Sequence, residues 1–194
     1  AQGLALLPLP EGHGDPHKAG QRDTGRHGHR AESDPHIWVS PANVRHMAAR
    51  IAEAFAKADP AHARVYAANL AVFQKQIDGL DAELRAIFAG VSVDRRSFLV
   101  FHPAWGYLAR DYGLTQMAIE FEGKEPSPRR LAAMVAQAQA KDTTVIFVQP
   151  QMSQRTAGSI AQAIGARVVL ADPLAADWAA NLRAVAMSFR DALR

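Results

Sequence analysis

The sequence predicts an α/β protein in which one long helix is followed by a lobe built on a four-stranded parallel sheet. Two observations lead to this class. Apolar residues from 70 to 87 recur at spacings of three and four, which is the pattern of a long helix with one buried face. After residue 90, short apolar runs alternate with helical stretches, which is typical of parallel strands covered by crossover helices. With 194 residues, 48% of them hydrophobic, the chain can bury such a core.

The first 33 residues are expected to lie largely outside this core. Residues 1–10, AQGLALLPLP, offer one short strand that Pro8 and Pro10 would end. Residues 11–33 are rich in glycine, histidine and interleaved charges without any periodicity, and we expect a mobile loop there. The four histidines of this loop could bind metal weakly and transiently or could simply be solvated, and the sequence leaves both alternatives open. These are His13, His17, His27 and His29.

Residues 34–89 are expected to be helical. A first helix should begin at Pro41, and the Asp59-Pro60 pair should end it. A second helix, from about 61 to about 88, would be on the order of 40 Å long at about 1.5 Å per residue. A helix of this length can form a spine between two lobes or lie against a single core, and the pattern leaves both open.

Residues 90–194 are expected to form a βα lobe of right-handed βαβ units. The Ser127-Pro128 pair favours a helix start and Gly165 a helix end. The predicted strands are 98–101, about 115–119, 145–148 and 168–170. The predicted helices are about 104–112, 128–140, 153–164 and 177–192.

Polar side chains follow each predicted strand. They are His102 after the first, Glu120 after the second, Gln149 with Gln151 after the third, and Asp172 after the fourth. Ligands bind at this edge of open parallel sheets, beyond the carboxyl ends of the strands. Three of these positions are followed directly by proline, which restricts the preceding residue, although prolines also simply end strands.

A second cluster, DPHIW at 34–38, lies between the polar loop and the first helix. Asp34 can accept a hydrogen bond from the His36 ring and orient it for a metal, and Trp38 is expected to be buried beside it. A capping or core role is the ordinary alternative for such a histidine. The cluster therefore adds one candidate ligand, His36, to those at the strand ends.

The candidate metal ligands are His36, His102 and Asp172. Because the chain has no cysteine, any metal must be held by His, Asp or Glu. Two histidines and one carboxylate suit Zn²⁺ or, with more oxygen ligands, Mn²⁺, and the histidines favour zinc. Water, Glu120 or a residue outside this chain would complete a four-ligand site.

Five motifs, in one order along the chain, resemble the zinc- and manganese-binding solute receptors of bacterial ABC importers, especially the high-affinity zinc-uptake type. They are DPHIWVSP (34–41), FHPAWGYLARDYGL (101–114), EGKEPSP (122–128), VIFVQPQMS (145–153) and ADPL (171–174). The resemblance implies a two-lobed fold joined by a long helix, with metal in the cleft between the lobes. His36, His102 and Asp172 match the family's ligands in its DPHxW, FHP and DPL motifs.

The resemblance also implies a division of the chain. Residues 1–33 would be a remnant of the N-terminal lobe with the family's His-containing loop, 34–89 the inter-lobe helical segment, and 90–194 the C-terminal metal-binding lobe. Most of the N-terminal lobe, with its further histidine ligand, would be absent. The protein would be a periplasmic monomer, or an extracytoplasmic one anchored by a lipid, that delivers Zn²⁺ to the membrane permease of an ABC importer without catalysis.

Two other functions stay open. A zinc hydrolase could use the same three ligands with water in the open position, although there is no HExxH motif and Glu120 would have to act as the base. A structural or interaction module would use the apolar seam at 70–87 as an oligomer contact. The net charge of +3, from 22 basic and 19 acidic residues without a basic cluster, argues against nucleic-acid binding. No apolar run reaches the roughly 18 residues of a membrane-spanning helix.

Overall fold

The computed structural model describes residues 4–8, 33–120, 127–141 and 143–193. The four loop histidines and most of the EGKEPSP motif lie outside the described residues. Within residues 4–8, the strand expected near the start of the chain is reduced to one isolated antiparallel bridge, between Pro8 and Ser33. The bridge brings the start of the described chain beside the DPHIW segment.

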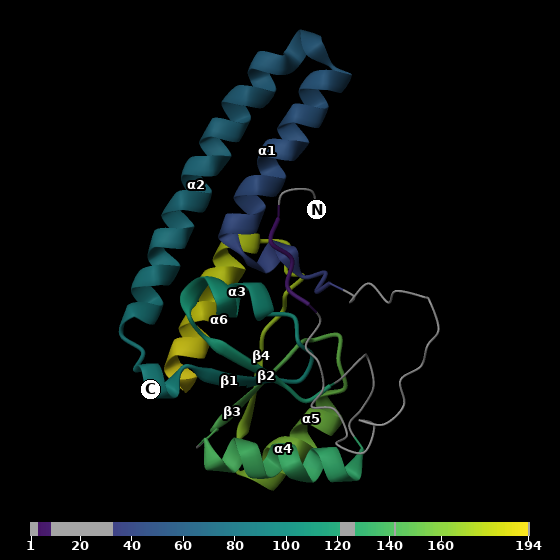
Figure 1. Cartoon of the computed structure of the whole chain (residues 1–194), viewed down its shortest axis with the longest axis vertical. Coiled ribbons are helices and arrows are strands. Elements are labelled where there is room, and N and C mark those ends of the chain that lie inside the picture. The colour runs from purple at the N-terminus through teal and green to yellow at the C-terminus, as the bar shows by residue number, and fades with distance from the viewer. Residues whose placement is uncertain (1–3, 9–32, 121–126, 142, 194) are drawn as a thin grey trace, which may run out of the picture.

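The two predicted helices of residues 34–89 are both present. After the short 3-10 helix η2 (Ile37–Val39), α1 spans Pro41–Ala58, and a second 3-10 turn, η3 (Pro60–His62), leads into α2 (Ala63–Ala89). Ser40 caps α1, because its hydroxyl accepts a hydrogen bond from the Asn43 N–H and the proline at the first position needs no partner. The α1–α2 pair forms an antiparallel hairpin (Figure 1).

The sheet has four parallel strands, as the sequence predicts, and the structure gives their order as β2-β1-β3-β4. The strands are β1 (Ser97–Val100), β2 (Thr115–Ala118), β3 (Val145–Val148) and β4 (Arg167–Leu170). The helices between and after them are α3 (Gly106–Tyr112), α4 (Pro128–Ala140), α5 (Gln154–Ile164) and α6 (Trp178–Ala192), and the 3-10 turn η4 (Val93–Arg95) precedes β1. The strand order reverses between β1 and β3, and in such sheets the loops on either side of the reversal diverge and leave a crevice.

The strands carry apolar side chains on both faces because both faces are covered. Phe98 and Val100 point into a core shared with α2, α3 and α6, whereas Leu99 and Phe101 point into a second core under α4 and α5. Figure 1 shows the same division, with α4 and α5 on one side of the sheet and α3 and α6 on the other. This sandwich, residues 93–193, is called the sheet lobe below.

The two halves of the long helix α2 pack against different parts of the chain. Its second half buries Leu80, Leu84 and Phe88 against the sheet lobe, whereas its first half pairs with α1 and extends away from it (Figure 1). Most of the apolar seam at 70–87 is therefore used inside the chain, which removes the main support for an oligomer contact there. Within the described part of the chain, no helix is long and apolar enough to cross a membrane.

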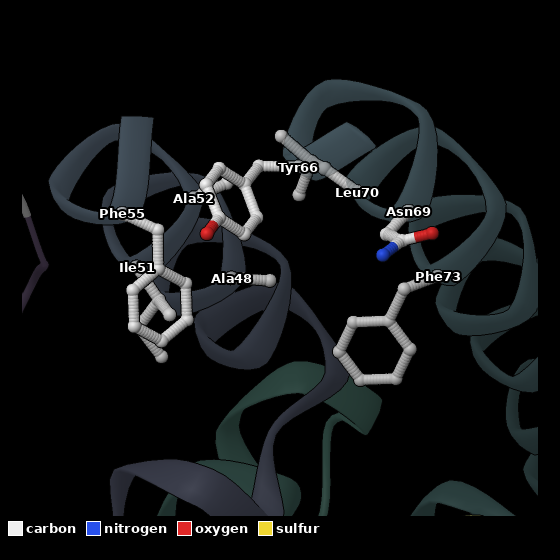
Figure 2. Close-up of a pocket in the computed structure, with 8 residues that line it drawn as sticks. All are labelled: Ala48, Ile51, Ala52, Phe55, Tyr66, Asn69, Leu70 and Phe73. Atoms are coloured by element: carbon white, nitrogen blue, oxygen red, sulfur yellow. The ribbon is translucent and has the colours of Figure 1, made fainter. Parts of the chain in front are cut away.

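The outer part of the hairpin, residues 48–73, is called the hairpin tip below. It holds an open hollow of about 370 Å³ between α1 and α2, lined mainly by apolar side chains that Figure 2 shows facing one another. Ile51 and Phe55 on α1 and Phe73 on α2 are each more than a third exposed. No candidate ligand predicted from the sequence lies in this hollow.

Candidate metal centre

The candidate ligands meet where the strand order reverses. His102 lies just beyond β1 and Gln149 just beyond β3, the two strands on either side of the reversal. His36 reaches the same place from the segment between the Pro8–Ser33 bridge and η2. The fold thus assembles two histidines that are 66 positions apart in the sequence.

The two imidazoles face each other edge to face. His36 Nε2 and His102 Nε2 lie 3.4 Å apart, and the ring centroids are separated by 5.2 Å at an interplanar angle of 75°. The Trp38 ring also packs against His36, edge to face, with its centroid 5.5 Å away. This packing limits the rotation of the His36 ring.

A buried carboxylate holds the far nitrogen of each ring. His36 Nδ1 lies 2.7 Å from Asp34 Oδ1, and His102 Nδ1 lies 3.0 Å from Glu120 Oε2. The side chains of Asp34 and Glu120 are only 2% and 6% exposed. A carboxylate accepts the proton of Nδ1–H, which leaves the lone pair of Nε2 for a metal ion. Both Nε2 atoms are therefore prepared as ligand atoms.

The separation of the two nitrogens suits a shared metal ion. Two unprotonated nitrogens have no proton to share in a hydrogen bond, so a cation between them is what would make the contact favourable. Zinc–nitrogen bonds of about 2.0–2.1 Å in a tetrahedral arrangement put two ligand nitrogens about 3.3–3.4 Å apart. The 3.4 Å between the two Nε2 atoms agrees with this value.

Asp34 is itself fixed by its surroundings. Its carboxylate also accepts the His36 backbone N–H at 2.9 Å, and its carbonyl accepts the Tyr107 hydroxyl at 2.9 Å. Gly106 makes room for the carboxylate, because a Cβ at that position would lie 3.0 Å from Asp34 Oδ2. Both Gly106 and Tyr107 belong to the FHPAWGY motif, but their role as supports of Asp34 was missed from the sequence.

Asp172 lies beyond β4, in a separate hydrogen-bond network. Its Oδ1 accepts the Leu174 N–H at 2.9 Å and the Gln151 Nε2–H at 3.1 Å, and its backbone carbonyl accepts Asn181 Nδ2–H at 2.7 Å. Among the residues that the structure describes, no group of three His, Cys, Asp or Glu side chains lies close enough to hold one metal ion. The structure therefore brings His36 and His102 together without Asp172, and the role of Asp172 as a ligand stays a prediction.

Two tryptophans connect the Asp172 loop to the His36 segment. Trp38 Nε1–H donates to the Pro173 carbonyl at 2.8 Å, and Trp178 Nε1–H donates to the Trp38 carbonyl at 2.8 Å. Trp38 is half-buried and packs against the core, whereas a buried position beside His36 was predicted. The bond to Pro173 explains the difference, because it draws the indole to the loop at the edge of the core. The roles of Trp178 and Asn181 have no local signal in the sequence.

Glu120 occupies a position that does not suit a catalytic base. Its Oε2 contacts His102 Nδ1, on the opposite side of the ring from Nε2. A base acting on a metal-bound water would have to approach the Nε2 side, where the metal would lie. Glu120 therefore orients His102 in this structure, and the hydrolase alternative loses its one candidate base.

Comparison with known proteins gives the family. The model of the family described as the zinc-uptake complex component A, periplasmic (ZnuA), matches residues 2–192. The chain belongs to this family. A crystal structure of ZnuA aligns with all of this chain and 68% of its own, with a TM-score of 0.86 and 39% identity. A crystal structure of a ZnuA deletion mutant with zinc bound aligns with 99% of this chain and 66% of its own, with a TM-score of 0.84 and 40% identity.

A curated relative gives a similar result. The zinc-binding lipoprotein AdcA of Streptococcus pneumoniae is 30% identical over 172 residues, which are 87% of this chain and 33% of AdcA. The chain spans 44%, 57% and 33% of the first three curated relatives that it matches. The resemblance predicted from the five motifs, to zinc receptors of ABC importers, is thus confirmed at the level of the family.

Proposed function

We propose that this chain captures Zn²⁺ between His36 Nε2 and His102 Nε2, and that the protein it represents delivers the ion to the membrane permease of an ABC importer. The observation that carries the proposal is the pair of facing imidazoles, 3.4 Å apart, each held by a buried carboxylate. Membership of the ZnuA family supports the same reading.

Asp172 is proposed as the third ligand. Its Oδ1 is held by Leu174 and Gln151, and within the described residues its Oδ2 receives no hydrogen bond. A carboxylate with one oxygen held and the other open is oriented for metal binding. The Trp38–Pro173 hydrogen bond already joins the 172–174 loop to the His36 segment, so a rearrangement of the Asp172 side chain and its Oδ1 contacts would have to bring Oδ2 to the ion.

The ligand set favours zinc over manganese. Two imidazole nitrogens with one carboxylate are typical of a tetrahedral zinc site, whereas manganese prefers more oxygen ligands. The names of AdcA and of the zinc-bound ZnuA structure record zinc for those relatives. We therefore propose Zn²⁺ as the physiological cargo, with Mn²⁺ bound more weakly.

The proposal also includes the cellular location of the protein and the roles of its segments. Residues 34–89 would be the inter-lobe helical segment and 90–194 the metal-binding lobe of a monomeric receptor. The periplasmic description of the family supports a location outside the cytoplasm. If the protein is held at a membrane surface, we propose that a lipid anchors it, because the name of AdcA describes that relative as a lipoprotein. Reversible binding needs no base, which agrees with the position of Glu120.

Zinc titration by calorimetry tests the proposal, on the unmodified chain and on His102→Ala. Submicromolar binding of one ion per chain that disappears in the variant is the expected result. Absence of binding by the unmodified chain, or equal binding by both proteins, would contradict the proposal. A hydrolysis assay of the zinc-loaded chain should stay at background, and turnover that depends on zinc and His102 would favour the hydrolase alternative.

A further inference from the structure

The hydroxyl of Tyr107 lies between two paired backbone segments. In a hydrogen-bonded antiparallel pair, two opposite residues exchange both of their backbone hydrogen bonds. Leu7 and Asp34 are opposite each other, and the Asp34 N–H donates directly to the Leu7 carbonyl at 2.9 Å. The other direct bond is replaced by two, because the Leu7 N–H donates to the Tyr107 hydroxyl at 3.1 Å and this hydroxyl donates to the Asp34 carbonyl at 2.9 Å.

Neither direction in this arrangement can be reversed. A backbone N–H only donates and a carbonyl only accepts, so the phenol must accept from Leu7 and donate to Asp34. Tyr107 is 0% exposed, so water does not replace its hydroxyl. Without that hydroxyl, both backbone groups would be unpaired unless the two segments drew together to form the missing bond directly. Either result changes how firmly, or where, Asp34 is held.

The position of Asp34 determines the position of His36. The Asp34 carboxylate accepts the His36 backbone N–H at 2.9 Å and lies 2.7 Å from His36 Nδ1. On the opposite side of the same ring, His36 Nε2 lies 3.4 Å from His102 Nε2. A displacement of Asp34 therefore changes the separation of the two proposed ligand atoms.

Tyr107 is itself fixed relative to His102. It follows His102 by five positions, and the turn between them is attached to the sheet, because the Trp105 N–H donates to Gln116 Oε1 on β2 at 2.7 Å. The Trp105 side chain is buried in the core beside β1. One segment, 102–107, thus carries one ligand and the hydroxyl that supports the other.

We propose that Tyr107 is a positioning residue for zinc capture, whose hydroxyl sets the separation of the two imidazoles by holding Asp34 in place. This inference rests on the proposed function. The contacts run without a break from the hydroxyl through Asp34 and His36 to His102. The role belongs to the hydroxyl, because the ring carries neither of the two hydrogen bonds. It holds whichever groups supply the remaining ligands of the ion.

The test compares Tyr107→Phe with Tyr112→Phe as the matched control. Both tyrosines are buried on α3, but the Tyr112 hydroxyl donates to Asp81 on α2 and not to the His36 segment. In calorimetric titrations, Tyr107→Phe should bind zinc about 10-fold more weakly, the lower end of the range typical of residues that support a metal ligand. Tyr112→Phe should bind zinc like the unmodified chain. Unchanged affinity in Tyr107→Phe, or equal losses in both variants, would overturn the inference.

A double-mutant cycle with Asp34→Ala separates positioning from a general structural role. Because the effect passes through the Asp34 carboxylate, Tyr107→Phe should weaken zinc binding clearly less in the Asp34→Ala protein than in the unmodified chain. The same loss in both backgrounds would overturn the inference. Absence of zinc binding by the unmodified chain would instead overturn the proposed function.

A second variant moves Asp34 without changing the phenol. In Gly106→Ala, the new Cβ would lie 3.0 Å from Asp34 Oδ2 and push the carboxylate away from its place. Zinc binding should again weaken, and thermal unfolding of the metal-free variants confirms that each is folded at the titration temperature. Full zinc affinity in Gly106→Ala would overturn the inference whether or not Tyr107→Phe folds.

Discussion

Two aspartate–histidine pairs in the described part of the chain have nearly the same contact and very different surroundings. His36 Nδ1 lies 2.7 Å from Asp34 Oδ1 beside the sheet lobe, and His62 Nδ1 lies 2.8 Å from Asp59 Oδ2 on the hairpin tip. The His36 side chain is 14% exposed and that of His62 is 64% exposed. Only His36 has a second imidazole facing its Nε2 atom within the described chain.

The two pairs differ in their surroundings, although the local contact between carboxylate and imidazole is the same. A carboxylate fixes the proton on one ring nitrogen wherever the pair occurs, but an exposed pair is screened by water and contributes little. At His36 the fold adds burial and a facing ligand, His102, at the strand reversal. A metal site therefore requires the second ligand and the burial as well as the pair.

The largest expected difference between the two pairs comes from removing the histidines. His36→Ala should weaken zinc binding by at least about 100-fold, because it removes a direct ligand and exceeds the effect typical of a supporting residue. His62→Ala, the matched control, should bind zinc like the unmodified chain. Calorimetric titration of both variants measures the difference, and a comparable loss in His62→Ala would show that the hairpin tip takes part in binding.

Removing the carboxylates should give a smaller difference in the same direction. Asp34→Ala should weaken zinc binding by about 10- to 100-fold, because the His36 ring loses the partner that fixes its proton on Nδ1. Asp59→Ala should leave zinc affinity unchanged. Competition with a chromophoric chelator reports both values, and circular dichroism checks that Asp34→Ala is folded. If the folded Asp34→Ala protein keeps full affinity, the buried carboxylate has no role in orienting His36.

Two tyrosines extend the comparison to stability. Tyr112 OH donates to Asp81 Oδ1 at 2.8 Å against the sheet lobe, and Tyr66 OH donates to Asp59 Oδ2 at 2.8 Å on the hairpin tip. Burial, together with the hydrogen bond to Asp81, raises the pKa of Tyr112 well above its usual range. The hydrogen bond to Asp59 also raises the pKa of Tyr66, which is much less enclosed.

The raised pKa of Tyr112 sets the pH range in which the contribution of this residue to the free energy of unfolding is lost. The folded state favours the neutral phenol, so the contribution is complete below the ordinary tyrosine pKa of about 10 and falls as pH rises above it. Tyr112→Phe should lower the free energy of unfolding by about 1 kcal/mol at pH 7 and lose less stability than the unmodified chain between pH 9 and pH 11. Urea unfolding at several pH values measures this, with Tyr66→Phe as the control that should change less. Parallel pH profiles of Tyr112→Phe and the unmodified chain would contradict the assignment.

The sequence predicted the elements of this fold well, because each depends on local patterning. The seam at 70–87 and the stop at Asp59-Pro60 gave the two helices of the hairpin, and the apolar runs gave all four parallel strands in their observed places. The rule that ligands gather beyond parallel strands selected His102. The selection of His36 came from its motif, and the pairing of the two follows from the fold.

The contacts that complete the site could not be predicted in the same way. Trp178 and Asn181 lie on the last helix, where Asn181 donates to the Asp172 carbonyl and Trp178 to the Trp38 carbonyl. No local periodicity in the sequence predicts these long-range contacts. The place of the Tyr107 hydroxyl between two backbone segments depends on how the chain has folded, and its residue type alone is uninformative. The distance between Asp172 and the histidines depends on a loop, whose side chains are not fixed by a strand register.

The smallest expected effect concerns two exposed ion pairs, and here the two regions should behave alike. Glu83 pairs with Arg183 between α2 and α6, and Glu53 pairs with Lys57 on the hairpin tip. The glutamates are 51% and 45% exposed. The hydrogen bonds to Arg183 and Lys57 lower the pKa of each, so any contribution is present at neutral pH and lost as pH falls through the lowered pKa.

Glu83→Gln and Glu53→Gln should therefore each leave the melting temperature at pH 7 within experimental error of the unmodified chain, because water and salt screen pairs this exposed. Thermal unfolding at low and moderate salt measures both variants side by side. If burial decides the differences between the two regions, the two substitutions must change the melting temperature equally little, since neither glutamate is buried. A clear drop in the melting temperature of Glu83→Gln alone would mean that the sheet lobe strengthens its contacts by some property other than burial.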